Sequence, residues 1–147
     1  MMFTQTLTTE EFAGQVINDV SATFAGVMTS LGDKLGLYKT LAFAAPMTAQ
    51  QLANKTQLAE RYLREWLNGQ VAGGYLAYDK KNETYKLPDA YVPILADTES
   101  PFFLVPALSV AASLWHDEDR LKEVFKSGEG IAWSEHHHSL FCGSESL

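Results

Sequence analysis

The residues best suited to chemistry lie late in the chain, where His116, His136–His138 and the single cysteine, Cys142, occur. Imidazole and thiolate groups can bind zinc, and they can also act as acid, base or nucleophile. Three adjacent histidines cannot all face one ion on a helix, because successive residues turn by about 100°. We therefore expect a hydrogen-bonded or solvated His136–His138 run, with no metal site and no catalytic residue. A zinc site and an activated Cys142 are the alternatives.

An apolar stretch precedes these histidines. Residues 105–115 are almost wholly apolar, and Trp133 and Phe141 follow later. This stretch either packs against the rest of its own domain or forms the wall of a pocket that another domain or subunit completes. For a substrate pocket, the candidate contacts are Trp115, His116, Trp133 and His137. A histidine there could accept a proton from a hydroxyl group.

Basic residues form a second candidate group that could bind DNA phosphates. They are Arg61, Arg64, Lys80 and Lys81, and Glu60 and Glu65 oppose them. Typical DNA binding neutralises about six to ten phosphates, more than these four cations can. The net charge of −7 also disfavours contact with nucleic acid. We therefore expect no nucleic-acid partner, and a winged-helix transcriptional regulator is the alternative function.

The elements that must position these groups are those of a winged helix-turn-helix. Thr48 and Gln51 have the spacing of a capping box, which begins a short helix. A second helix is predicted over 60–72, and Gly73-Gly74 ends it. Alternating apolar residues over 75–87 predict a hairpin with Leu76, Tyr78, Tyr85 and Leu87 on one face. The predicted fold is mainly α, a winged helix-turn-helix with a two-stranded β-hairpin wing plus flanking helices.

A long first helix is predicted upstream, beginning at a Thr8–Glu11 capping box. Its apolar stripe is a core face or a surface shared with a second subunit, and the candidate dimer contacts are Phe12, Val16, Val20, Phe24 and Val27. Gly14, Ala22, Ala25 and Gly26 are small enough to let another backbone approach. Gly32-Asp33 is expected to break this helix and start a second one. The inward residues of that second helix would be Leu35, Tyr38, Leu41 and Ala45, and Pro46 would stop it.

Further helices are predicted after the wing. Ser100-Pro101 is expected to start one of them, with Pro106 kinking or restarting it. Residues 117–126 form an amphipathic helix with Leu121, Val124 and Phe125 facing inward. These patterns divide the chain into N-terminal helices for dimerisation (1–46), the winged helix-turn-helix (47–88) and a helical extension (89–147).

Bulk composition fits one globular unit, with 147 residues of which 46% are apolar. A single cysteine excludes an intrachain disulfide. We expect neither a secretory leader nor a membrane span, and hence a cytoplasmic protein. Gly128-Glu129-Gly130 follows a helical pattern rather than a strand, so it does not predict a nucleotide site.

Several runs of sequence resemble the N-terminal region of class I S-adenosylmethionine-dependent methyltransferases. The segment Gly32 to Leu41 is similar to their second helix. Met47 to Ala53 and Arg61 to Leu67 resemble their helix-turn-helix, and Gly73 to Leu76 leads into a wing as it does there. Phe125 to Ile131 is similar to the segment that precedes their catalytic domain.

This resemblance, to enzymes similar in layout to plant small-molecule O-methyltransferases, implies a role without cofactor residues in this chain. In such enzymes the winged-helix region mediates dimerisation and covers the substrate, while a following Rossmann-like domain binds S-adenosylmethionine. The glycine-rich loop of that domain is absent from this sequence. The resemblance thus implies a truncated, homodimeric lid domain for a small-molecule substrate. S-adenosylmethionine is expected only for the full-length parent.

Overall fold

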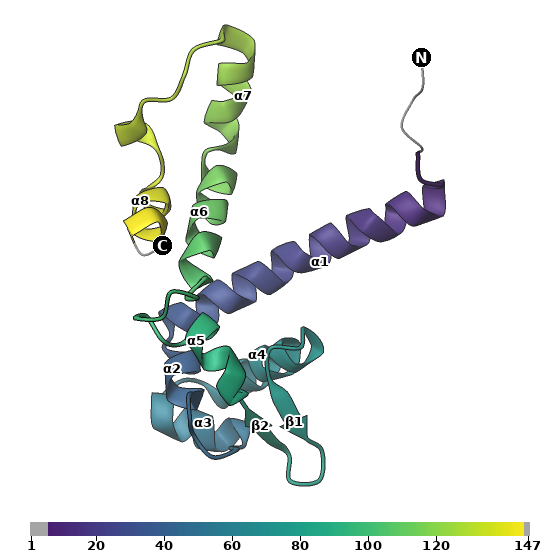
Figure 1. The fold of residues 1–147 in the computed structure, drawn as a ribbon, viewed down its shortest axis with the longest axis vertical. Coiled ribbons are helices and arrows are strands. Elements are labelled where there is room, and N and C mark those ends of the chain that lie inside the picture. The colour runs from purple at the N-terminus through teal and green to yellow at the C-terminus, as the bar shows by residue number, and fades with distance from the viewer. Residues whose placement is uncertain (1–5, 146–147) are drawn as a thin grey trace.

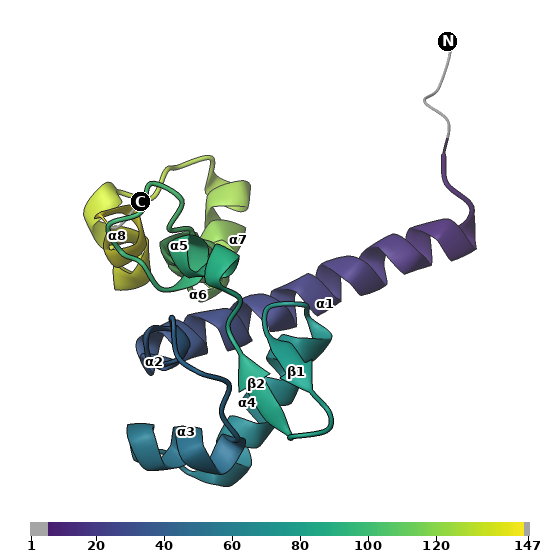
Figure 2. The same cartoon turned by 60° about the horizontal axis from the view of Figure 1, so that its bottom comes forward.

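The computed structural model describes residues 6–145, which form a winged-helix body with two projections (Figure 1). One projection is the first half of the long helix α1, and the other is a lobe made of α6, α7 and α8 (Figure 1). Turning the molecule shows that α1 extends well beyond the body (Figure 2). The helical elements are α1 Thr9–Lys34, α2 Leu37–Leu41, α3 Ala49–Thr56, α4 Glu60–Ala72, η1 Asp89–Tyr91, α5 Val92–Leu95, α6 Val105–His116, α7 Glu118–Ser127, η2 Trp133–Glu135 and α8 His138–Glu145.

Helix α1 begins as its sequence predicts and continues further than expected. Thr8 accepts a hydrogen bond from the amide of Glu11 at 3.2 Å, and Glu11 Oε2 accepts one from the Thr8 amide at 2.8 Å. The predicted break at Gly32-Asp33 is wrong, because the helix runs to Lys34. The reversal occurs at Gly36, which adopts a φ of +68° that glycine tolerates without strain.

The short helix α2 differs from its prediction at both ends. Leu35 is 42% exposed and Ala45 is also exposed, whereas Leu37, which the pattern did not select, is fully buried. The turn at Gly36 shifts the register, so that Leu37 rather than Leu35 enters the core. Pro46 does not stop the helix, because α2 already ends at Leu41.

The winged helix-turn-helix is confirmed element by element. Thr48 and Gln51 form the predicted capping box of α3, and α4 spans the predicted residues. Strand β1 (Ala77–Asp79) pairs antiparallel with strand β2 (Thr84–Lys86) to form the wing. Tyr78 lies opposite Tyr85, with ring centroids 4.8 Å apart. Tyr85 is buried and Tyr78 is 41% exposed, so only part of the predicted apolar face is covered.

The second half of α1 is fixed to the winged helix through Trp66 of α4. The Trp66 Nε1–H donates a hydrogen bond to the carbonyl oxygen of Met28 at 2.8 Å. Gly32 lies directly against the Trp66 ring, and a Cβ atom there would also lie 2.9 Å from Tyr38 Cε2. Gly32 therefore permits close helix packing and does not break the helix.

A buried hydrogen bond joins α2 to α4 within this core. Tyr38 is fully buried, and its hydroxyl donates to Oε1 of the buried Gln70. Burial raises the pKa of Tyr38 to about 12, so the phenol stays protonated in the ordinary pH range. Residues from α2, α3, α4 and the end of the wing complete this core, among them Leu41, Leu52, Leu67 and Leu87.

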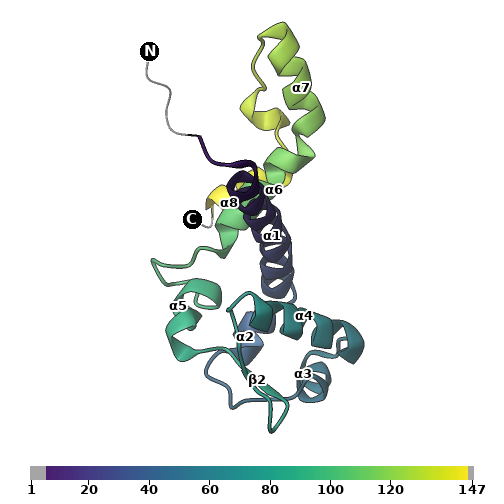
Figure 3. The ribbon, with the colours of Figure 1, turned by 90° about the vertical axis from the view of Figure 1, so that its right-hand side faces the viewer.

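The lobe after the wing starts later than predicted. Ser100-Pro101 lies in a turn, where Ser100 Oγ accepts from the Phe102 amide at 3.1 Å, so Ser100 does not cap a helix. Helix α6 starts at Val105, and Pro106 occupies its first turn without a kink. In α7, which lies at the far end of the lobe (Figure 3), Phe125 is 91% exposed and does not face inward as predicted.

Helix α8 packs closely on α6 through a glycine. A Cβ atom on the buried Gly143 would lie 2.7 Å from Val110 Cγ2 and 2.8 Å from the carbonyl oxygen of Pro106. Only glycine fits there without a shift of one helix.

Within residues 6–145 the structure has no helix with the length and apolar character that crossing a bilayer requires.

Candidate functional site

Helix α1 carries an apolar stripe that none of the residues 6–145 covers. Every residue from 6 to 24 is exposed, and α1 projects beyond the body (Figure 2). The exposed fractions of the predicted interface residues are Phe12 56%, Val16 43%, Val20 51%, Phe24 70% and Val27 63%. Such contiguous apolar exposure is unusual in a monomeric protein and marks an interaction surface. Within residues 6–145 this half of α1 is therefore not packed as a core face.

The stripe leads into a pocket between α1 and α6. The pocket has a volume of about 690 Å³, which lies in the range of small-molecule sites. Val27 of the stripe lies in the wall of this pocket, and so does Leu31, the next exposed apolar residue of α1. Its lining comprises Ala22, Thr23, Gly26, Val27, Ser30, Leu31, Lys34, Leu108, Ala111, Ala112, Trp115 and His116.

A histidine cluster lies at the junction of α6, α7 and α8. The His116 and His137 rings are stacked, with centroids 3.8 Å apart and planes inclined by 14°. The His138 ring lies 4.4 Å from that of His137. Asp117, which is 4% exposed, joins the cluster from the junction between α6 and α7: its Oδ2 lies 2.8 Å from His136 Nδ1 and accepts from the His137 amide at 3.3 Å. These contacts tie the chain before α8 to the end of α6.

The contacts around His137 favour its neutral form. Its Nδ1 accepts a hydrogen bond from the Ser139 amide at 3.3 Å and lies 2.8 Å from Ser139 Oγ. Burial lowers the pKa of His137 below its usual 6.5, and the neighbouring His116 and His138 lower it further. The His136 hydrogen bond lowers the pKa of Asp117, which therefore stays ionised.

Acid is expected to loosen α8. At Asp117 and His137 the folded chain binds fewer protons than the unfolded chain, because both groups have a lowered pKa, so the stability that they contribute decreases as the pH falls. The His137 contribution is complete above pH 6.5 and is lost below it, and the Asp117 contribution is lost below its usual 3.8. Hydrogen exchange, corrected for intrinsic rates, should show α8 losing protection from pH 7.5 to about 5.5 while α4 does not. His137→Asn should remove most of this change; equal protection of α8 at both pH values would contradict the assignment.

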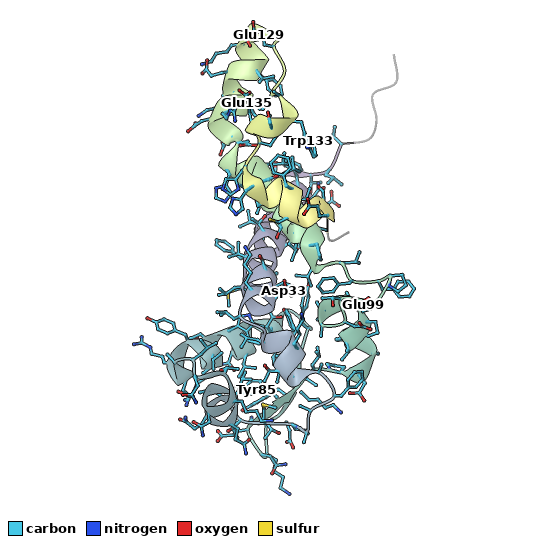
Figure 4. The ribbon with its side chains drawn as sticks, turned by 90° about the vertical axis from the view of Figure 1, so that its left-hand side faces the viewer. Asp33, Tyr85, Glu99, Glu129, Trp133 and Glu135 are labelled. Carbon is cyan, nitrogen blue, oxygen red and sulfur yellow. The ribbon has the colours of Figure 1, made fainter. Side chains whose placement is uncertain are left out.

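The structure brings together three of the four predicted substrate contacts. Trp115 and His116 line the pocket, and His137 stacks on His116. Trp133 lies in the upper lobe, away from Tyr85 in the winged helix, and it does not line this pocket (Figure 4). Its ring instead packs against His136 and Phe141, with centroid distances of 6.2 and 5.3 Å.

The polar part of the α1 wall was not predicted from the sequence. Thr23, Ser30 and Lys34 were not selected, because they lie beside the apolar stripe and not within it. The small residues were the available signal, since Ala22 and Gly26 predicted the close approach of another backbone. The neighbour found at Gly26 is a side chain of α6 in the same chain: a Cβ atom on Gly26 would lie 3.4 Å from Leu108 Cδ2.

The surface that DNA would contact carries few free cations. The Arg64 guanidinium is engaged by Glu60 of the same helix at 2.5 Å. On α4 and the wing, Arg61, Lys80 and Lys81 form no ion pair with any residue in the range 6–145. Three cations are fewer than the phosphate contacts of typical DNA binders. In the same range, no group of three or more His, Cys, Asp or Glu side chains is arranged to hold a metal ion.

The helix-turn-helix, the hairpin wing and the apolar flanking helices define a winged-helix domain. The chain belongs to the family of Rv2258c-like winged HTH domains, whose profile matches residues 23–96. A comparison with curated proteins gave no significant match.

Solved structures of similar fold include three methyltransferase chains. The mitomycin 7-O-methyltransferase MmcR is 22% identical with a TM-score of 0.62, over 82% of this chain and 36% of its own. PigF, solved with SAH, is 19% identical with a TM-score of 0.64, over 88% and 39%. A provisionally assigned O-methyltransferase from Nostoc punctiforme PCC 73102 is 22% identical with a TM-score of 0.62, over 92% and 40%. The chain thus shares their fold and spans about two fifths of their length.

Proposed function

We propose that this chain is the dimerising and substrate-covering part of an S-adenosylmethionine-dependent methyltransferase. The observation that carries the proposal is the uncovered apolar stripe of α1, which runs directly into the pocket between α1 and α6. The structural similarity to O-methyltransferases supports this role, and one of those relatives was solved with SAH.

In this proposal each of the three parts of the chain has a role of its own. Residues 1–46 provide the two-fold contact through Phe12, Val16, Val20, Phe24 and Val27, residues 47–88 form the winged helix-turn-helix, and residues 89–147 cover the acceptor. Trp115 and His116 contact the methyl acceptor directly, and His137 positions His116 through the ring stack. Trp133 supports His136 from outside the pocket.

Sizing chromatography with light scattering tests the proposal. We expect the purified chain to behave as a homodimer. We also expect no heat on titration with S-adenosylmethionine, because the cofactor would bind to a Rossmann-like domain and not to these residues. A monomer at every concentration tested would reject the dimerising role, and a micromolar cofactor signal would place the cofactor site in this chain.

The alternative of a DNA-binding regulator gives the opposite result in a retention assay. At ~150 mM salt, where the Debye length is about 8 Å, we expect no retention of duplex DNA. The reason is the small number of free cations on α4 and the wing, in a chain of net charge −7. Mobility shifts with a pool of random duplexes would measure this, and Arg61→Gln should change nothing. Sequence-selective retention at this salt concentration would support the regulator.

A further inference from the structure

The charge of the pocket between α1 and α6 differs from that of the rest of the protein. The chain contains 18 acidic and 11 basic residues, yet no carboxylate lines this pocket. Lys34, in the last turn of α1, is its basic lining residue, and the remaining polar groups come from Thr23, Ser30 and His116. No carboxylate of residues 6–145 forms an ion pair with Lys34. The Lys34 ammonium is thus available to a ligand.

The shape of the pocket favours a flat ligand. Small residues line both walls, Ala22 and Gly26 on α1 and Ala111 and Ala112 on α6. At these positions the facing surfaces of α1 and α6 carry only small side chains, which leaves room for a ring system between the two helices. Leu108 and Trp115 add apolar area, which favours a ring system over a polar or highly charged molecule.

We propose that this pocket binds a flat apolar molecule that carries one acidic group, with the rings between α1 and α6 and the anion beside Lys34. Charge complementarity selects this class of occupant, because an anion meets a free ammonium and no carboxylate. The inference rests on the proposed function, since it names the class of acceptor that the substrate-covering surface receives.

A pair of dyes with the same ring skeleton tests the assignment in the full chain. The probe 1-anilinonaphthalene-8-sulfonate is anionic, and N-phenyl-1-naphthylamine is its neutral counterpart. Fluorescence titration should give one site per chain, with the anionic dye bound about tenfold more tightly, as expected for one hydrogen-bonded charge. Equal affinity for the two dyes, or no binding of either, would overturn the proposal. The second outcome would include a pocket filled by a second copy of the chain.

Variants separate the charge from the apolar slot. Lys34→Gln should remove the preference for the anionic dye, and Lys34→Arg should keep it. Lys39→Gln, which alters an exposed lysine of α2 outside the pocket, is the matched control and should change nothing. An anionic preference that survives Lys34→Gln would rule out the role of Lys34.

Filling the slot tests the location. Ala112→Phe should weaken both dyes at least tenfold, whereas Ala77→Phe, at an exposed position of the wing, should leave both unchanged. A cooperative urea transition in each variant shows that the dyes report on a folded chain. Unchanged dye binding in Ala112→Phe would place the site elsewhere. The dimer measurement is separate from these titrations, so a failed dye test with an intact dimer rejects this ligand class and leaves the dimerising role in place.

Discussion

A chain carrying Val20→Asp is expected to be monomeric under conditions in which the unmodified chain is a dimer. Val20 lies in the middle of the uncovered α1 stripe and is 51% exposed in the single chain. A carboxylate there would be buried without a partner in any two-fold contact, and such burial costs several kcal/mol. Light scattering after sizing chromatography measures the result directly.

The single chain itself should tolerate this substitution, because the position is open to solvent. Surface changes of this kind usually alter the free energy of unfolding by no more than about 0.5 kcal/mol. Asn18→Asp is the matched control, since it adds the same charge about 200° around the helix from Val20. If Asn18→Asp and Val20→Asp dissociate the dimer equally, the contact does not involve the stripe. If Val20→Asp remains dimeric, the shared-helix proposal is rejected.

Adding one methyl group at Gly32 is expected to destabilise the fold. The Cβ atom of Gly32→Ala would overlap the Trp66 ring and approach Tyr38 Cε2 to 2.9 Å. Both rings are fixed by hydrogen bonds, Trp66 to the Met28 carbonyl and Tyr38 to Gln70, so neither can move freely. Overpacking of this kind costs about 1–3 kcal/mol, which should exceed the gain in helix propensity. Urea unfolding followed by circular dichroism measures the loss.

The same glycine-to-alanine substitution at Gly14 should raise the free energy of unfolding instead of lowering it. Gly14 lies in the same helix, and a Cβ atom there meets nothing within 4 Å. Gly14→Ala should therefore stabilise the monomer by up to about 1 kcal/mol through helix propensity alone. A loss of stability in both variants would point to the backbone of α1 rather than to the contact with Trp66. An unchanged free energy of unfolding in Gly32→Ala would show that the Trp66 and Tyr38 rings can move aside.

Local sequence signals predicted the elements whose determinants are close together in the chain. The two capping boxes, at Thr8–Glu11 and Thr48–Gln51, formed as expected because each needs only two side chains three residues apart. The hairpin followed from alternation around a polar turn. The errors occurred where a residue has two possible roles: a glycine such as Gly32 can end a helix or admit a neighbour, and only the neighbour distinguishes them.

The pocket residues show the same difference between what a local signal predicts and what only a tertiary contact decides. Trp115 and His116 were predicted because aromatic and imidazole side chains are conspicuous in an apolar run, whereas Lys34 and Ser30 are ordinary residues on a helix edge. Nothing local indicates that α1 and α6, far apart in sequence, share a pocket. Phe125 shows the converse, since its helical period predicted burial but no element covers it.

The sequence by itself determined the helix-turn-helix, the wing and the shortage of cations, because capping, turn chemistry and net charge depend on short stretches or on composition. Only the tertiary structure decided which apolar faces are buried and which stay open. The stripe of α1 and the face of α7 have the same period as a core helix, and periodicity cannot specify a partner. Burial depends on which elements meet in space. In this chain the first half of α1 meets no other element and stays exposed, whereas its second half contacts Trp66 and α6.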